Sequence, residues 1–147
     1  MSCVFCAIAD GQLPAHIIHQ DEHFLVLLDI FPLRPAHVLI VAKGHAPFLA
    51  DLPSQPRDAL LALADRLAKA LYRSEPDVLG INLLLNDGPV ANQHVPHLHL
   101  HLIPRRNGDL PALCWRTVTR FLPLGRKRIE ARLAREAERL RAALQEA

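Results

Sequence analysis

Three histidines alternate with leucines in the segment His97-Leu98-His99-Leu100-His101, and apolar residues continue to Ile103. In a β-strand successive side chains point to opposite faces, so this alternation predicts three imidazoles on one face and leucines in a core on the other. Imidazoles side by side can serve as metal ligands, as general acid–base groups, or as a nucleophile with its supporting groups. The alternative is three solvated histidines on an edge strand, which packing alone seldom produces. The pattern therefore indicates a functional strand.

The chain has 147 residues, of which 50% are hydrophobic and 22% charged, and this predicts a single globular domain with a substantial core. The net charge of the chain is +2. The segment from Arg126 onward has seven Lys/Arg and four Glu and therefore a charge of +3, so the rest of the chain has a charge of −1. Because the rest of the chain is not basic, no nucleic-acid partner is expected. Neither a signal peptide nor a membrane-spanning run is recognisable, so we expect no membrane association. Three cysteines, an odd number, argue against a disulfide framework and predict a cytoplasmic location.

Strand-like runs precede the histidine strand at residues 15–19, 23–29, 37–43 and 81–86. A helix is predicted over Ser54–Ser74, because Ser54 suits an N-cap and four leucines recur at helical spacing: Leu60, Leu63, Leu67 and Leu71. Five strands with one major helix between the third and fourth predict an α+β fold built on an antiparallel sheet.

The C-terminal part is predicted to consist of a loop and a helix. Residues 108–124, with Pro111 and Pro123, give no clear secondary-structure signal. A helix is expected from about Gly125 to the end, with a narrow apolar stripe that packs on the domain or on a partner subunit: Ile129, Leu133, Ala137, Leu140 and Leu144. The expected organisation is one domain over 1–147, with a core at 3–106 and the C-terminal loop and helix at 107–147.

Taken together, these residues make the chain resemble the histidine triad (HIT) family. The family motif is His-φ-His-φ-His-φ-φ, where φ is apolar, and residues 97–103 satisfy every position. Further matches lie upstream in the family's order: Cys3-Val4-Phe5-Cys6, Asp29-Ile30, Pro32, His37, Lys43-Gly44-His45, Asn86-Asp87-Gly88 and Gln93. Asn92 replaces a glycine found in many relatives, and asparagine tolerates the left-handed conformation that such a position requires. The resemblance implies a HIT-like fold.

The resemblance also implies that the chain binds an adenine nucleotide and cleaves the bond to its α-phosphate through a nucleotidyl-histidine intermediate, without a catalytic metal. His99 would be the nucleophile, with His97 beside it, while His101 and His37 would donate to the phosphate oxygens. Asp29 would accept from the ribose hydroxyls. The remaining implied contacts are polar ones to the phosphate from Asn86, Gln93 and His94, and apolar ones to the base from Phe5, Ile8, Leu13, Leu27 and Ile30.

Cys3 and Cys6 have the two-residue spacing of half a zinc site. The resemblance implies that His45 and His97 complete it as a structural zinc site, as in bacterial relatives with this opening. A pair of free thiols is the alternative.

Three activities of the family remain open. The ending Leu102-Ile103-Pro104-Arg105 favours dinucleoside polyphosphate hydrolysis over nucleoside phosphoramidate hydrolysis, and phosphorolysis of dinucleoside polyphosphates is the third. A nucleotide-binding regulator with residual catalysis is a further alternative. A catalytic metal held by the triad is disfavoured, because no obvious carboxylate ligand lies near it in the sequence.

The resemblance also implies a homodimer. HIT domains generally pair by joining their sheets edge to edge and packing one helix from each subunit, which here would be the helix over Ser54–Ser74. We expect the C-terminal helix to lie across the subunit boundary.

Overall fold

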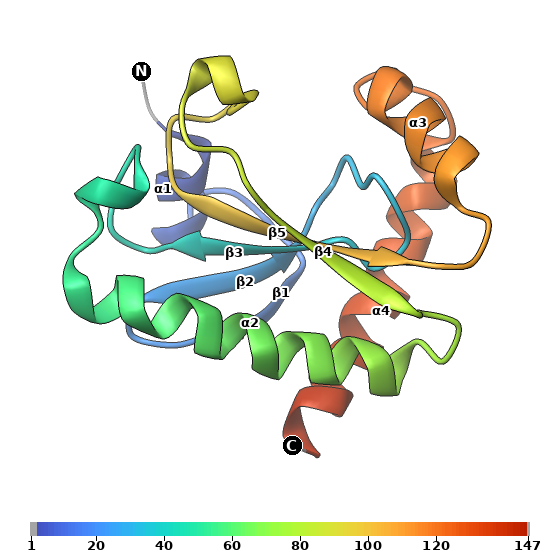
Figure 1. The fold of residues 1–147 in the computed structure, drawn as a ribbon, viewed down its shortest axis with the longest axis horizontal. Coiled ribbons are helices and arrows are strands. Elements are labelled where there is room, and N and C mark those ends of the chain that lie inside the picture. The colour runs from blue at the N-terminus through green and yellow to red at the C-terminus, as the bar shows by residue number, and fades with distance from the viewer. Residues whose placement is uncertain (1–2, 147) are drawn as a thin grey trace.

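A five-stranded antiparallel sheet with the order β1-β2-β3-β5-β4 forms the centre of the structure, a computed structural model that describes residues 3–146 (Figure 1). The strands are β1 (Ile17–Gln20), β2 (Phe24–Leu28), β3 (Val38–Ala42), β4 (Gly80–Leu85) and β5 (His99–Arg105). The helices are α1 (Val4–Ala9), α2 (Ser54–Ser74), α3 (Leu110–Thr119) and α4 (Arg126–Gln145), with short 3₁₀ turns η1 (Leu49–Asp51) and η2 (Pro89–Ala91). The predicted α+β fold is confirmed, with α2 as the major helix between β3 and β4.

The two faces of the sheet carry different layers. One face packs on α2 and α4 and includes Leu98, Leu100 and Leu102, the leucines of the alternating segment. The other face carries a smaller apolar cluster around Phe5 of α1. His99 pairs with Val41 and His101 with Leu39, and both of these partners belong to the smaller cluster. The predicted division of the strand, leucines inward and histidines on the opposite face, is confirmed.

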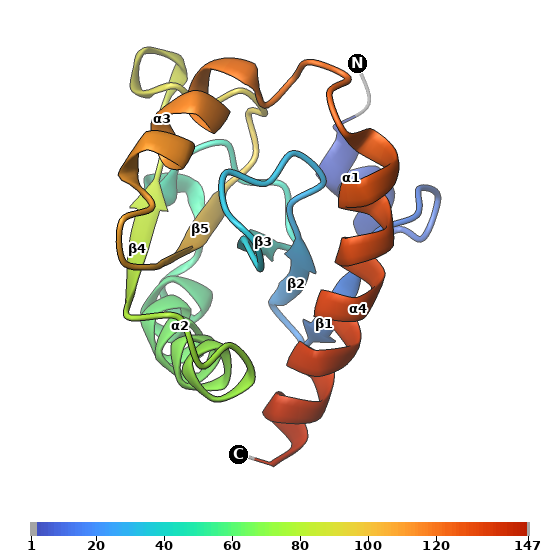
Figure 2. The same ribbon diagram turned by 90° about the vertical axis from the view of Figure 1, so that its right-hand side faces the viewer.

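The C-terminal helix packs within its own chain, against β1 and α2 (Figure 2). Leu133 and Leu140 are at most 1% exposed and lie in the core that α2 also enters. Of the two packings expected for the apolar stripe, on the domain or on a partner subunit, the structure shows the first. The stripe is narrow, but Ala137 and Ala143 are small and also buried in that core, so the helix can approach the sheet closely.

The segment expected to be a loop, 107–124, contains the helix α3. Pro111 lies in the first turn of α3, where proline fits because its missing N–H has no helical partner to lose. The proline therefore begins a helix and does not interrupt one. Only Thr119 of α3 is buried, so the helix shows little of the apolar periodicity that would have identified it.

Two further expectations concern the backbone and the membrane. Asn92 has a φ of 68°, the left-handed conformation expected for a residue that replaces glycine. Across residues 3–146, none of the helices combines the length and hydrophobicity that crossing a bilayer requires.

Candidate active site

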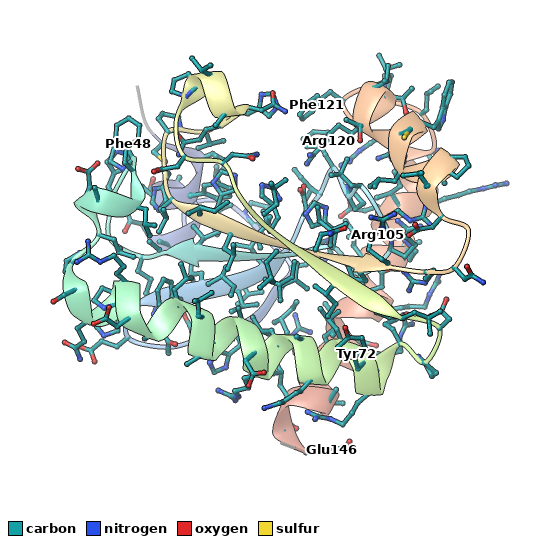
Figure 3. The ribbon with its side chains drawn as sticks, in the orientation of Figure 1. Phe48, Tyr72, Arg105, Arg120, Phe121 and Glu146 are labelled. Atoms are coloured by element: carbon teal, nitrogen blue, oxygen red, sulfur yellow. The ribbon has the colours of Figure 1, made fainter. Side chains whose placement is uncertain are left out.

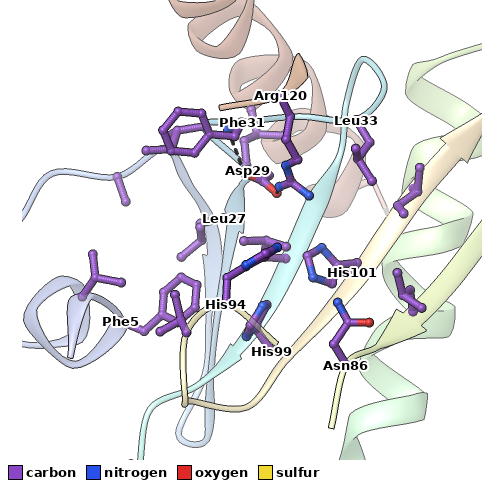
Figure 4. Close-up of a pocket in the computed structure, with 18 of the residues that line it drawn as sticks. Phe5, Leu27, Asp29, Phe31, Leu33, Asn86, His94, His99, His101 and Arg120 are labelled. Atoms are coloured by element: carbon purple, nitrogen blue, oxygen red, sulfur yellow. Dashed lines mark hydrogen bonds and ion pairs between the residues drawn. The ribbon is translucent and has the colours of Figure 1, made fainter. Parts of the chain in front are cut away.

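A cavity of about 850 Å³ opens beside the histidine strand (Figure 4). Its walls come from α1, the end of β2 with the loop that follows, β4, β5 and α3. The predicted site residues that line it are Phe5, Ile8, Leu13, Leu27, Asp29, Ile30, Asn86, His94, His99 and His101. Three predicted site residues do not line the cavity: Gln93, His37 and His97. Their side chains form hydrogen bonds with other residues of the protein.

The ring of His99 is held in one tautomer. Its Nδ1 lies 2.7 Å from the carbonyl oxygen of His97, an acceptor only, so Nδ1 carries the proton and donates it. Nε2 is then the nitrogen with the free lone pair. Burial lowers the pKa of His99 below its usual value, so the imidazole is neutral at pH 7. A neutral imidazole with an unshared Nε2 lone pair can act as a nucleophile.

Two successive hydrogen bonds hold the ring of His101 in the other tautomer. The backbone N–H of Leu33 donates to Nδ1 of His37 (3.1 Å), so His37 carries its proton on Nε2. That Nε2 lies 2.9 Å from Nδ1 of His101 and donates to it. His101 therefore carries its own proton on Nε2 and presents an N–H donor. His37 is 0% exposed, so it orients His101 and does not reach a phosphate, which corrects its predicted role.

His37 and His101 are both neutral at physiological pH. Burial lowers the pKa of His37 to about 4 and that of His101 to about 3. His101 can thus donate a hydrogen bond, but it does not carry a positive charge at pH 7.

Asp29 is buried and paired with a residue that the sequence did not indicate. Its Oδ2 lies 2.7 Å from Nη2 of Arg120, just beyond the end of α3, and its Oδ1 accepts the N–H of Phe31 (2.8 Å). Burial alone would raise the pKa of Asp29, but His37, Arg120 and the Phe31 N–H together lower it. Because His37 is neutral at pH 7, its 3.6 Å approach to Asp29 is not an ion pair, and Arg120 supplies the countercharge.

The wall formed by α3 and the residues after it was missed entirely. Leu113, Thr117, Arg120 and Phe121 line the cavity at intervals of four, three and one residues, which is one face of a helix. Figure 3 shows Arg120 and Phe121 at the α3 end of the molecule, on the side toward the loop before β5. The ring of Phe121 meets that of His94 edge to face, with centroids 5.3 Å apart. The helical spacing of these four residues was the one signal in the sequence, and Pro111 and Pro123 argued against a helix there.

Gln93 stabilises the loop before β5. Its side-chain oxygen accepts the N–H of Gly88 (3.1 Å) and its nitrogen donates to the carbonyl of Pro47 (2.7 Å). These two contacts position the loop, and Gln93 itself does not line the cavity. Asn86 lines the cavity and donates to the carbonyl of Asn92 at 3.3 Å, a long bond that leaves its amide available.

A second cluster lies behind the start of the histidine strand and brings together Cys3, Cys6, His45 and His97. The nitrogen–sulfur distances are 3.3 Å for Cys3–His97, 3.3 Å for Cys6–His45 and 3.6 Å for Cys6–His97, and the two Nδ1 atoms are 3.3 Å apart.

These distances fit a tetrahedral metal. With Zn–S near 2.3 Å and Zn–N near 2.0–2.1 Å, a tetrahedron separates two nitrogens by about 3.4 Å and nitrogen from sulfur by about 3.6 Å. Nε2 of His97 lies 2.6 Å from the carbonyl oxygen of Ala42, so it donates its proton there and leaves Nδ1 free for a metal. The four residues thus have the ligand types, spacing and tautomer that zinc requires.

The sequence relatives are HIT proteins. The HIT domain model matches residues 10–108. A HIT-like protein of Mycobacterium tuberculosis is 40% identical over 109 residues, which cover 74% of this chain and 75% of that protein. An adenosine 5'-monophosphoramidase of Candida albicans is 37% identical over 109 residues, 72% of each chain.

The fold has a similar counterpart among solved structures. A zinc-bound histidine triad family protein of Mycobacterium smegmatis matches with a TM-score of 0.81 and 40% sequence identity, covering 99% of this chain and 95% of that one. The similarity therefore extends over α3 and α4, beyond the region that the domain model matches.

Proposed function

Because the chain belongs to the histidine triad (HIT) family of nucleotide hydrolases and nucleotidyltransferases, we propose that it cleaves adenine nucleotides at the α-phosphate through a nucleotidyl-His99 intermediate. The observation that carries this proposal is the state of His99 in the cavity: neutral, with Nδ1–H given to a carbonyl and the Nε2 lone pair free.

In the first step, Nε2 of His99 attacks the α-phosphorus. A P–N bond forms while the bond from phosphorus to the leaving group breaks and its electrons depart with that group. Negative charge builds on the phosphate oxygens, and the Nε2–H of His101 and the amide of Asn86 donate to them. In the second step a water attacks the same phosphorus, the P–N electrons return to Nε2 of His99, and the proton of the water passes to solvent.

For the substrate we propose a dinucleoside polyphosphate with water as the acceptor. The apolar lining from α1 and β2, which includes Phe5 and Leu27, suits an adenine base, and the Asp29 carboxylate at the end of β2 suits a ribose. Arg120 lines the cavity and pairs with Asp29, but its buried Nε has no hydrogen-bond partner among the described residues, so the guanidinium can also donate to a polyphosphate leaving group. Such a group departs as an anion and needs no proton from the protein.

A nucleoside phosphoramidate is the second candidate substrate. Relatives in Candida albicans and Saccharomyces cerevisiae are named adenosine 5'-monophosphoramidases, at 37% and 35% identity. An amine leaving group must be protonated, and His94 is an exposed imidazole on the cavity lining that suits a proton donor.

A turnover panel tests the proposal: diadenosine tetraphosphate with and without orthophosphate, and adenosine 5'-phosphoramidate. Hydrolysis of the tetraphosphate to AMP and ATP supports the first substrate; release of ADP with ATP only when phosphate is present indicates phosphorolysis instead. His99→Ala is expected to abolish turnover and to keep AMP affinity within a few-fold of wild type, because the base and ribose contacts lie elsewhere. A wild-type protein that binds AMP but turns over none of these compounds would be a regulator, and the catalytic proposal would be wrong.

We further propose that Cys3, Cys6, His45 and His97 hold a structural zinc ion. When bound, zinc would cross-link α1 to the start of the histidine strand. The carbonyl of His97 also accepts the Nδ1–H of His99, so fixing His97 would fix the tautomer of the nucleophile.

Metal analysis tests this second proposal. The wild type is expected to contain about one zinc per chain, and the Cys3→Ser/Cys6→Ser variant none, with a lower Tm because binding to the folded state alone stabilises it. Cys114→Ser is the matched control, since Cys114 is an exposed free cysteine outside the cluster. Zinc retained in the double variant would rule out this ligand set.

We also propose that the chain, as one domain, forms a homodimer through the edge of β4. Leu83 of this edge strand is 50% exposed and Tyr72 near the end of α2 is 47% exposed, and an open apolar edge is a surface for pairing. Light scattering at micromolar concentration is expected to give a dimer for the wild type and for Val90→Glu, whose position is fully exposed in η2, but a monomer for Leu83→Glu. A monomeric wild type would refute the dimer.

A further inference from the structure

A second cavity, of about 310 Å³, lies between α3, the start of α4 and the loop that carries Pro32 and Pro35. Four arginines line it, and we call it the arginine cleft: Arg34, Arg116, Arg128 and Arg132. It shares only Leu33 with the lining of the active-site cavity, so the two are neighbouring but separate spaces. No residue of the cleft takes part in the proposed reaction.

Two of the four guanidinium groups each lie near one carboxylate. Nε of Arg34 lies 3.2 Å from Oδ2 of Asp109, but Asp109 is already bound by Arg105 at 2.7 and 3.1 Å. Nε of Arg132 lies 3.0 Å from Oε1 of Glu136.

The other two have no acid partner among residues 3–146. Arg116 donates from Nε to the carbonyl of Pro32 at 3.2 Å, and Arg128 forms neither an ion pair nor a side-chain hydrogen bond there. Four positive charges therefore face two carboxylates, one of which Arg105 shares, so the cleft has a net positive charge.

The buried N–H groups of the cleft are poorly satisfied. Nη2 of Arg116 is inaccessible and has no hydrogen-bond partner within the described part of the chain. Nε of Arg34 and Nε of Arg132 are also inaccessible, and each lies near a carboxylate oxygen without hydrogen-bond geometry. Folded proteins rarely leave buried donors unsatisfied, and guanidinium donors are suited to bidentate contacts with phosphate oxygens. Burial and the neighbouring charges of Arg120, Arg132 and Arg126 lower the pKa of Arg116, which agrees with a site where positive charge is in excess.

The start of α4 adds a further positive contribution. Gly125, which lines the cleft, is the N-cap residue and provides no side-chain cap, and the first turn contains no acidic residue. The first turn contains Arg126, Lys127 and Arg128, and the positive end of the helix dipole repels their positive charges. An anion in the cleft would accept from the free N–H groups and offset these charges.

We propose that the arginine cleft binds orthophosphate or one phosphoryl group of pyrophosphate. The convergent guanidinium N–H groups match a tetrahedral oxyanion, and the lining contains no aromatic side chain on which a nucleotide base could stack. The bound anion would join α3, α4 and the loop through Arg116, Arg128 and Arg34. That loop contains Leu33, whose N–H fixes His37, so occupancy of the cleft would stabilise the hydrogen-bond chain of the active site.

Amide chemical shifts during titration with orthophosphate and pyrophosphate test the proposal, with chloride at equal ionic strength as the reference. We expect saturable shifts at Arg34, Gly125 and Arg128. Arg128→Ala is expected to weaken the fitted affinity about ten- to a hundredfold, because one charge-assisted contact is lost. Lys127→Ala, which removes an equal charge from the same turn but outside the cleft, should change it less than twofold.

Two results would overturn the proposal. One is the absence of saturable shifts at the cleft while the shifts at His99 and Asn86 change, which would place the anion in the active-site cavity only. The other is an equal loss of affinity in Arg128→Ala and Lys127→Ala, which would reduce the effect to general attraction by the helix terminus. Neither result bears on the nucleotide chemistry proposed for His99, so the two proposals fail independently.

Discussion

Replacing Arg120 by methionine removes the positive charge that Asp29 faces in the active-site cavity. The side chains of the pair are 14% and 7% exposed, so the carboxylate has little water to replace its partner. Only the Phe31 N–H and the neutral His37 remain beside it. Breaking a buried pair by removing one member costs about 3–5 kcal/mol, and we expect the lower end, about 3 kcal/mol, because the cavity admits some solvent. For a chain of this length that corresponds to a fall in Tm of about 6–12 °C.

Urea denaturation of a double-mutant cycle measures this effect. Asp29→Asn combined with Arg120→Met leaves no unpaired charge and is expected to lie within about 1 kcal/mol of wild type. The pKa of Asp29 is lowered in the folded state, so the pair stabilises at pH values above the unfolded pKa of about 3.9, and this contribution disappears as the pH falls through the folded pKa. The penalty of Arg120→Met should therefore shrink as the pH falls below about 4, where Asp29 becomes protonated. A single variant within 0.5 kcal/mol of wild type at pH 7 would refute the reasoning.

Three further predictions concern the histidines and α4. His101→Ala should lower kcat about 10²–10³-fold in steady-state assays, since one donor to the phosphate is lost; a loss below tenfold would contradict that role. The free energy of unfolding should fall as the pH drops from 6.5 toward 4, because the unfolded chain takes up protons that buried His37 and His101 do not; a flat profile would argue against these lowered pKa values. Leu140→Ala should cost about 2–5 kcal/mol in urea denaturation, whereas the exposed Leu122→Ala stays within about 0.5 kcal/mol; equal effects would argue against the packing of α4.

Residues whose placement follows from local periodicity were predicted well. The alternation around His99 determines which face each side chain takes, and the leucine spacing in Ser54–Ser74 determines the buried side of α2, whose bounds agree with the structure. The ligand cluster also followed from motif positions, because Cys3, Cys6, His45 and His97 lie on segments that the fold brings together.

Contacts that depend on distant parts of the chain were not predictable from local patterns. Arg120 meets Asp29 across 91 positions, and nothing in the sequence around Arg120 distinguishes it from the other basic residues of the C-terminal region. The role of His37 depended on the turn before it, where Ala36 adopts a φ of 61° and the N–H of Leu33 reaches the ring. An interpretation based on motif position alone placed His37 on the phosphate, although its burial excludes that contact.

The order of the chain separates the reacting groups from one wall of the cavity. His99, His101 and Asn86 all precede Pro104, whereas Leu113, Thr117, Arg120 and Phe121 belong to a later segment that joins them only in three dimensions. Evolution can therefore change the later segment without altering the proposed nucleophile, its tautomer or the proposed donor beside it. A chimera that receives residues 107–124 from a relative would be expected to inherit that relative's choice of leaving group while keeping its own phosphorus chemistry. In this chain, substrate range and reaction type can diverge independently.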